Sequence, residues 1–238
     1  MATKRTGDTR VKAALACVAI SLLAPLLVFI AAAGVKTGAW DRAFAFDVLT
    51  LKAAWALAWV GAAAAVGALI LAFGAWKRAG IFAALAIVVA GLTIGQFLRH
   101  DAGIKANQSS PDVSTNPADP PVFSRQIMAV RPAGDAALMA RWAQQGARCP
   151  AAVSVPTQVA PGVAGYALKE AGFEVAGIGV GRADGSHHSF WFGFTHDAVV
   201  RIRPGRTDVR VTARDDRDDG GEACRLATRI VEVLQTSP

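Results

Sequence analysis

Three uncharged apolar stretches near the start of this chain limit its folds more than any other feature. Residues 13–35, 53–75 and 79–98 contain no Asp, Glu, Lys or Arg. Each is long enough for a helix that crosses a hydrocarbon layer of about 30 Å. A helix that packs on a soluble core needs a polar face, and these stretches have none. The sequence therefore predicts a transmembrane region at 13–98, built from three helices.

The formal net charge of +7 belongs almost entirely to this membrane region. Residues 1–98 contain nine Lys or Arg and three Asp, a net of +6. Residues 99–238 contain sixteen Lys or Arg and fifteen Asp or Glu, a net of +1. The C-terminal region thus lacks the basic excess that binds nucleic acid, and we expect no nucleic-acid partner.

The positions of the positive charges predict the orientation of the spans. The tail at 1–12 has four Lys or Arg against one Asp, and Lys77-Arg78 joins the second and third spans, whereas charges in the 36–52 loop nearly balance. Positively charged flanks stay in the cytoplasm. We therefore expect an inner-membrane protein with a cytoplasmic N-terminus and a periplasmic C-terminal domain. The first span, which ends near Ala31-Ala32-Ala33, also resembles a signal peptide, and its cleavage would leave that domain on the same side.

Strongly polar side chains are scarce within the three spans. They are Ser21, Thr93 and Gln96, and none of the three is charged. Since charged intramembrane residues usually mark proton or ion pathways, this pattern does not favour transport. We expect membrane lipid as the partner of this region.

The composition changes at residue 99. Residues 99–121 include Pro111, Pro117, Pro120 and Pro121, which predict an extended strap. Residues 122–238 have the apolar periodicity of alternating helices and strands. Helices are expected at 134–145, 161–172 and 221–234, and strands at 173–180, 188–194, 198–203 and 207–214. Short connections favour an antiparallel sheet, so we predict an α+β domain with about four strands packed by two main helices.

Cys149 and Cys224 are the only cysteines after the spans. In an oxidising compartment such a pair is a candidate disulfide. The alternative is two buried free thiols, because a sequence does not show whether the two Cα atoms approach within about 7 Å.

Three blocks in the C-terminal region resemble, in order, the bacterial domain-of-unknown-function family numbered 1499. They begin at Asp112-Val-Ser-Thr, at Gly172-Phe-Glu-Val and at Asp208-Val-Arg. The resemblance covers about residues 107–235. It departs from the family pattern at 213–226, where Asp215, Asp216 and Asp218 are added and Ala223 occupies the position at which relatives have Asn. It implies a topology rather than an activity. The residues that carry the family pattern are Asp112, Ser114, Thr115, Pro120, Pro121, Phe123, Trp191, Phe192, Phe194 and Asp219.

One group of basic residues is a candidate binding surface. Strand alternation allows four arginines to share one sheet face, where they could bind an anionic headgroup: Arg201, Arg203, Arg210 and Arg214. The alternative is a solvated face on which Asp197, Asp208 and the acidic run at 215–219 neutralise them as cross-strand pairs.

No known catalytic, phosphate-binding or metal-binding motif occurs in the sequence. We therefore assign no catalytic residue, metal or cofactor. The leading hypothesis is a non-catalytic envelope protein whose periplasmic domain binds lipid or another envelope protein. The alternative is a membrane-anchored, hydrolase-like enzyme in which Asp219 works with Arg214 or His196.

Overall fold

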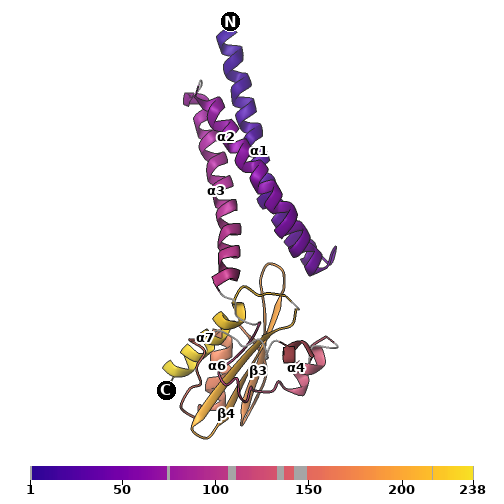
Figure 1. The fold of residues 1–238 in the computed structure, drawn as a ribbon, viewed down its shortest axis with the longest axis vertical. Coiled ribbons are helices and arrows are strands. Elements are labelled where there is room, and N and C mark those ends of the chain that lie inside the picture. Colours follow the sequence, from indigo (N-terminus) through magenta and orange to yellow (C-terminus); the bar gives the residue numbers. More distant parts are fainter. Residues whose placement is uncertain are drawn as a thin grey trace. The chain divides into compact units, whose positions relative to one another are not determined.

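The computed structural model describes residues 2–73, 76–106, 111–132, 137–141, 149–215 and 217–237. The chain divides into two compact units, residues 1–101 and 102–238. Figure 1 shows long helices in the first and a sheet with shorter helices in the second. This architecture confirms the predicted fold class.

The first unit consists of helices that are long and apolar enough to cross a membrane. They are α1 (Ala2–Lys36), the π-helix η1 (Phe44–Ala54) that continues as α2 (Trp55–Ala72), and α3 (Trp76–Ala106). Within the described residues the candidate spans are Thr9–Lys36, Phe44–Ala72 and Trp76–Lys105.

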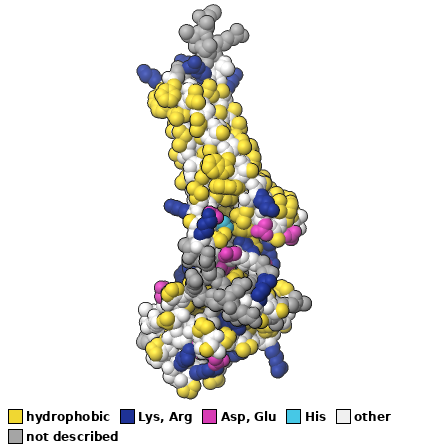
Figure 2. Space-filling view, viewed as in Figure 1, with side chains coloured by type: hydrophobic (Ala, Val, Ile, Leu, Met, Phe, Trp, Pro, Cys, Tyr) yellow, Lys and Arg dark blue, Asp and Glu magenta, His cyan; other side chains and the backbone are white. Residues whose placement is uncertain are grey.

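Small residues fill the interior of this unit, and large apolar residues cover its outside. Ala14, Ala68 and Ala83, from the three helices, are fully buried in one cluster. The Ser21 hydroxyl donates to the carbonyl of Gly61 over 3.1 Å, and a Cβ at Gly61 would lie 3.1 Å from Ser21 Cα. Hydrophobic side chains cover the helices in Figure 2. Without a hydrophobic effect between helices in lipid, such close packing is what holds them together.

The second span starts earlier than 53–75. Most of the predicted 36–52 loop is helical, because the Asp41 carboxylate accepts a hydrogen bond from Phe44 N (2.9 Å) and starts the helix there.

The second unit contains a five-stranded antiparallel sheet in the order β1-β5-β4-β3-β2. The strands are β1 (Asp112–Ser114), β2 (Glu174–Gly179), β3 (Arg182–His188), β4 (Thr195–Arg203) and β5 (Arg206–Ala213). The helices described beside them are α4 (Arg125–Val130), α6 (Pro161–Glu170) and α7 (Glu222–Thr236). The predicted helix at 134–145 lies partly outside the described residues, of which 137–141 are helical.

Two features of the sheet differ from the sequence prediction. The fifth strand, β1, comes from the Pro-rich strap, where Asp112–Ser114 pair with β5. A short edge strand tolerates neighbouring prolines because its outer side needs no ladder partner. The strand predicted at 188–194 is instead β3 at 182–188, and the aromatic run after it is a loop. Pairing of His188 with Thr195 ends the ladder there.

Alternation gives the sheet two very different faces. One carries Val113, Ala198, Val200 and Val211, which pack with α6 and α7 in the apolar core. The other carries charged residues and lies beneath the chain that runs from β1 through α4 (Figure 1). This second face holds the four candidate arginines.

Candidate functional site

Four carboxylates are buried on the charged face of the sheet. Their side chains are at most 5% exposed: Asp112, Asp184, Asp197 and Asp208. A buried carboxylate is costly unless it is paired and hydrogen-bonded. The arrangement of cations around these four residues therefore determines what this face can bind.

Asp112 pairs with Arg210 across the β1–β5 ladder. Arg210 donates from Nε to Oδ1 (2.8 Å) and from Nη2 to Oδ2 (2.6 Å), and the Thr212 hydroxyl donates to Oδ1 (2.6 Å). Arg210 also donates to the carbonyl of Pro121 (3.2 Å). This planar two-point geometry is the strongest form of ion pair available to arginine.

Asp197 holds two arginines from distant parts of the chain. Arg131, which follows α4, donates to Oδ2 over 2.6 Å, and Arg214 donates to both oxygens at 2.8 and 2.7 Å. The Ser186 hydroxyl adds a bond of 2.6 Å. The Arg131 and Asp197 side chains are both 0% exposed, so this pair is fully withdrawn from solvent.

Asp208 lies at the other end of the face. It accepts from Arg201 (2.8 Å), Arg206 (2.7 Å) and Ser154 (2.7 Å). Burial alone would raise the pKa of Asp208, but the hydrogen bonds from these three residues bring it below its ordinary value.

Asp119 extends the network to the surface. It pairs with Arg203 (2.8 Å) and Arg201 (3.2 Å), and hydrogen bonds from Arg203 and Arg201 lower the pKa of this carboxyl. The acidic partner of Arg203 thus comes from the strap rather than from a neighbouring strand.

The four arginines of the predicted anionic-ligand surface do lie on one face. Arg210 pairs with Asp112, Arg214 with Asp197, Arg201 with Asp208 and Asp119, and Arg203 with Asp119. Their guanidinium groups are occupied by carboxylates of this chain, as the cross-strand alternative expects. The carboxylates of these pairs, except Asp119, are buried rather than solvated. Binding of an anionic headgroup stays a prediction that this geometry does not favour.

The segment directly after the strap covers the network with the aromatic ring of Phe123. Phe123 is 4% exposed, and the guanidinium carbons of Arg131 and Arg210 lie 5.6 and 5.4 Å from its ring centre. Ser124 caps α4 and donates its backbone N–H to Asp184 (3.1 Å). Such cation–π contacts stabilise arginines that have left solvent.

Several residues of the family pattern meet at this cover. Ser114 Oγ donates to the carbonyl of Asn116 (3.1 Å), and Thr115 Oγ1 accepts from Val209 N (2.9 Å). Pro120 and Pro121 follow Asp119 in the strap. These contacts give Asp112, Thr115 and Phe123 a structural role in closing the charged face.

The aromatic residues of the family pattern lie elsewhere, in the β3–β4 loop Ser189–Phe194. Backbone hydrogen bonds join Ser189 N to Phe194 O (2.8 Å) and Gly193 N to Ser189 O (2.9 Å). Phe192 is 7% exposed, whereas Phe190 is 73% and Trp191 52% exposed. The Phe190 and Trp191 rings meet edge to face at 5.2 Å. We call these six residues the aromatic loop.

His196 and Asp219 form a closed pair on the core side of the sheet. Their Nε2 and Oδ2 atoms lie 3.2 Å apart, and each side chain is 5% exposed. Asp219 also accepts from Gly221 N (2.9 Å) and Ala223 N (2.7 Å), which holds the start of α7. Arg214, the other suggested partner of Asp219, is bound to Asp197 on the opposite face. This geometry serves the attachment of α7 to β4 and leaves a substrate little access.

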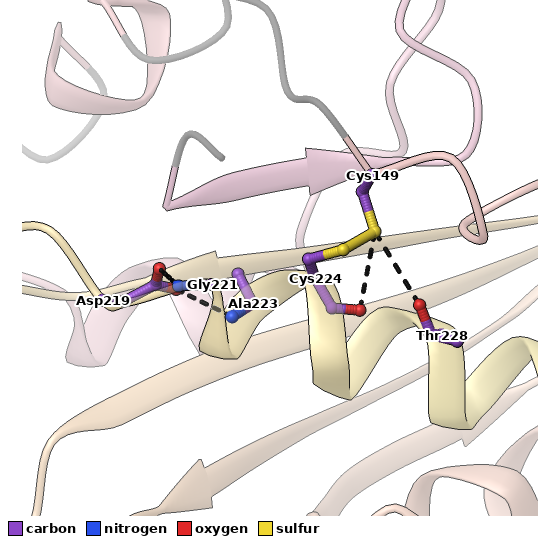
Figure 3. The surroundings of a disulfide bond; sticks show 6 residues. All are labelled: Cys149, Asp219, Gly221, Ala223, Cys224 and Thr228. Atoms are coloured by element: carbon purple, nitrogen blue, oxygen red, sulfur yellow. Dashed lines mark hydrogen bonds between the residues drawn. A yellow bond between two sulfur atoms is a disulfide. The ribbon is translucent and has the colours of Figure 1, made fainter. Parts of the chain in front are cut away.

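A disulfide joins the first turn of α7 to the segment that precedes α6, as Figure 3 shows. Cys149 and Cys224 are bonded with their Cα atoms 5.6 Å apart. Thr228 Oγ1, one turn along α7, lies 3.7 Å from the Cys149 sulfur. The predicted disulfide is confirmed, and it agrees with an oxidising compartment.

These features are those of a chain with three helices apolar enough to cross a membrane, followed by a disulfide-bonded α+β domain. Comparison with protein-family models, with curated proteins and with solved structures found no match. The resemblance to the family numbered 1499 therefore stays a prediction.

Proposed function

We propose that this chain is a bacterial inner-membrane protein whose periplasmic domain is a non-catalytic binding module for the membrane surface. The positive charges around the apolar helices support the orientation, and the disulfide supports an oxidising compartment. The observation that carries the binding role is the exposure of Phe190 and Trp191 on an ordered loop.

The aromatic loop has the chemistry of a membrane-interface anchor. Trp and Phe place apolar rings among lipid headgroups, and the indole N–H of Trp finds polar partners there. The loop holds its shape before it binds, because Ser189 Oγ also accepts from Phe194 N (3.0 Å). The Arg217 guanidinium carbon stacks over the Phe194 ring at 3.8 Å, which adds a cation at the base of the loop. A preformed loop loses little conformational entropy on binding.

Quenching of tryptophan fluorescence tests this proposal. The full-length protein is reconstituted in nanodiscs with phosphatidylcholine brominated near the carbonyl end of its chains, and Trp191→Phe identifies the emission of Trp191 by difference. We expect that emission to be quenched, and Phe190→Ser to reduce the quenching. Unquenched emission at the wavelength of a water-exposed indole would reject lipid binding and leave a protein partner as the explanation of the loop.

A further inference from the structure

The helical unit 1–101 contains a cavity of about 350 Å³. Its walls come from α1, η1 and α3. Pro25 and Val28 line it from α1, Phe46 and Thr50 from η1, and Gln96 and His100 from α3. The volume lies near the lower end of the range of about 300–1,000 Å³ for small-molecule sites. The cavity can therefore hold a headgroup and the start of a tail.

An irregular helix forms one wall of this cavity. The residues of η1 form a π-helix from Phe44 to Ala54, and Thr50 Oγ1 donates to the carbonyl of Ala45, five residues earlier (3.0 Å). A π-helix is a wider and less favourable coil than an α-helix, and it occurs frequently at functional sites. Opposite it, Pro25 lacks the N–H that would close the α1 ladder. Two departures from regular helix thus border the same space.

The polar groups of the cavity include an amide that lacks a protein partner. The hydroxyls of Thr50 and Thr93 donate to carbonyls of their own helices, Thr93 to Val89 O at 2.7 Å. Gln96 is an exposed residue of α3, and its amide makes no side-chain hydrogen bond within the described ranges. Where lipid rather than water surrounds this amide, the lack of a hydrogen-bond partner is costly. A ligand with hydrogen-bond acceptors would remove that cost.

The remaining lining selects the chemistry of the ligand. None of the eleven lining residues is Asp, Glu, Lys or Arg, so the cavity offers no permanent charge to a phosphate or carboxylate. Phe29, Phe46 and Phe97 contribute aromatic rings, and the His100 ring packs edge-on against Phe46 at 5.8 Å. Aromatic walls favour a flat ring. A flat uncharged ring with carbonyl acceptors and an apolar tail satisfies all of these groups.

From this geometry we propose that the cavity binds a quinone-headed isoprenoid lipid. The Gln96 amide donates to a ring carbonyl, the aromatic side chains stack against the ring, and the tail leaves between the helices into the bilayer. The proposal concerns binding only and is independent of the aromatic loop, because the lining residues all belong to the unit 1–101.

Trp55 provides a reporter for the test, because its ring lies 5.1 Å from that of the lining residue Phe97. Decylubiquinone is titrated into the full-length protein in detergent micelles, and the quenching of tryptophan fluorescence is measured. The part of the quenching that is missing in the Trp55→Phe variant belongs to Trp55. We expect saturation at one quinone per chain. Val28→Phe fills the cavity and should abolish saturable quenching. Its matched control is Leu26→Phe on the outer, 53% exposed side of α1, which should leave quenching unchanged.

Gln96→Leu tests the hydrogen bond without filling the cavity. It should weaken binding about tenfold, the equivalent of one hydrogen bond of about 1.4 kcal/mol. If Val28→Phe does not fold, this variant decides the question. Unsaturable quenching that is equal in the Val28→Phe and Leu26→Phe variants would overturn the proposal. Two further outcomes would also overturn it. One is displacement of the quinone by an equal concentration of decanol. The other is a single phospholipid that co-purifies with each chain and is lost only in the Val28→Phe variant.

Discussion

Asp112 and Arg210 form a two-point ion pair that joins the edge strand β1 to β5, with contacts of 2.8 and 2.6 Å. The Asp112 side chain is 3% exposed and that of Arg210 is 10% exposed. The Phe123 ring covers Arg210. Because Asp112 is part of the Pro-rich strap, this buried ion pair attaches the strap to the domain. Removing one partner of a buried ion pair leaves an uncompensated charge and lowers the stability of the fold strongly, whereas replacing both partners with apolar residues costs far less.

Asp112→Asn should destabilise the C-terminal domain by about 3–5 kcal/mol, because it leaves the Arg210 cation buried without its counter-charge. The measurement is the thermal unfolding midpoint of the domain transition in the full-length protein. Asp119→Asn is the control. The Asp119 side chain is 55% exposed, so its loss should shift the midpoint far less than the loss of Asp112. Equal shifts for the two variants would contradict a buried pair at Asp112.

Replacing both partners, as in Asp112→Leu with Arg210→Met, should recover much of the stability that Asp112→Asn loses. Apolar residues of similar volume need no counter-charge in a covered site. A double variant that is less stable than either single variant would show that the pair contributes more than mutual neutralisation. A double-mutant cycle on the unfolding midpoint provides the comparison.

Loss of the disulfide through Cys149→Ser with Cys224→Ser should destabilise the domain by about 2–4 kcal/mol, since the bond closes a sequence separation of 75 residues. Thiol counting in denaturant checks the bond directly. The chain has three cysteines and Cys17 is free, so one thiol should react before reduction and three after it. Three reactive thiols before reduction would contradict the bond.

The lowered pKa of Asp208 predicts a loss of stability in acid. Its carboxylate is favoured in the folded state, so its stabilising contribution is complete well above the ordinary value of 3.8 and is lost as the pH falls through and below that value. Asp208→Asn should lower the unfolding midpoint at pH 7 and flatten its dependence between about pH 5 and pH 3. A variant with an unchanged slope would assign the acid sensitivity to other carboxylates.

Gly185→Ala should destabilise the sheet by about 1–3 kcal/mol through overpacking. A Cβ at Gly185 in β3 would lie 2.9 Å from Glu174 O and 3.2 Å from Phe173 Cβ. Gly177→Ala in β2 is the matched control, because a Cβ there meets nothing within 4 Å. The midpoint of thermal unfolding should fall for the first variant and stay nearly constant for the second. The reverse order would be incompatible with the β2–β3 register.

Features that depend on local composition could be predicted from the sequence. The absence of charge over 13–35, 53–75 and 79–98 is sufficient for three long apolar helices, because lipid requires an internally bonded backbone. Strand alternation also placed Arg201 and Arg210 correctly on one face. Cys149 and Cys224 were a candidate pair because no other cysteine follows the spans.

Tertiary contacts decided the rest. Arg210 contacts Asp112 rather than solvent or a ligand because three residues of the strap form strand β1 beside β5. Asp112 and Arg210 are 98 residues apart in the sequence, so no local pattern predicts their pairing. The aromatic run at 189–194 alternates like a strand, but the β3–β4 register makes it a loop. The cavity beside Gln96 is lined by three separate helices. The sequence thus determined where the long apolar helices lie and that a sheet follows, since both depend on local patterns. Only the folded chain decided which charges are paired with one another.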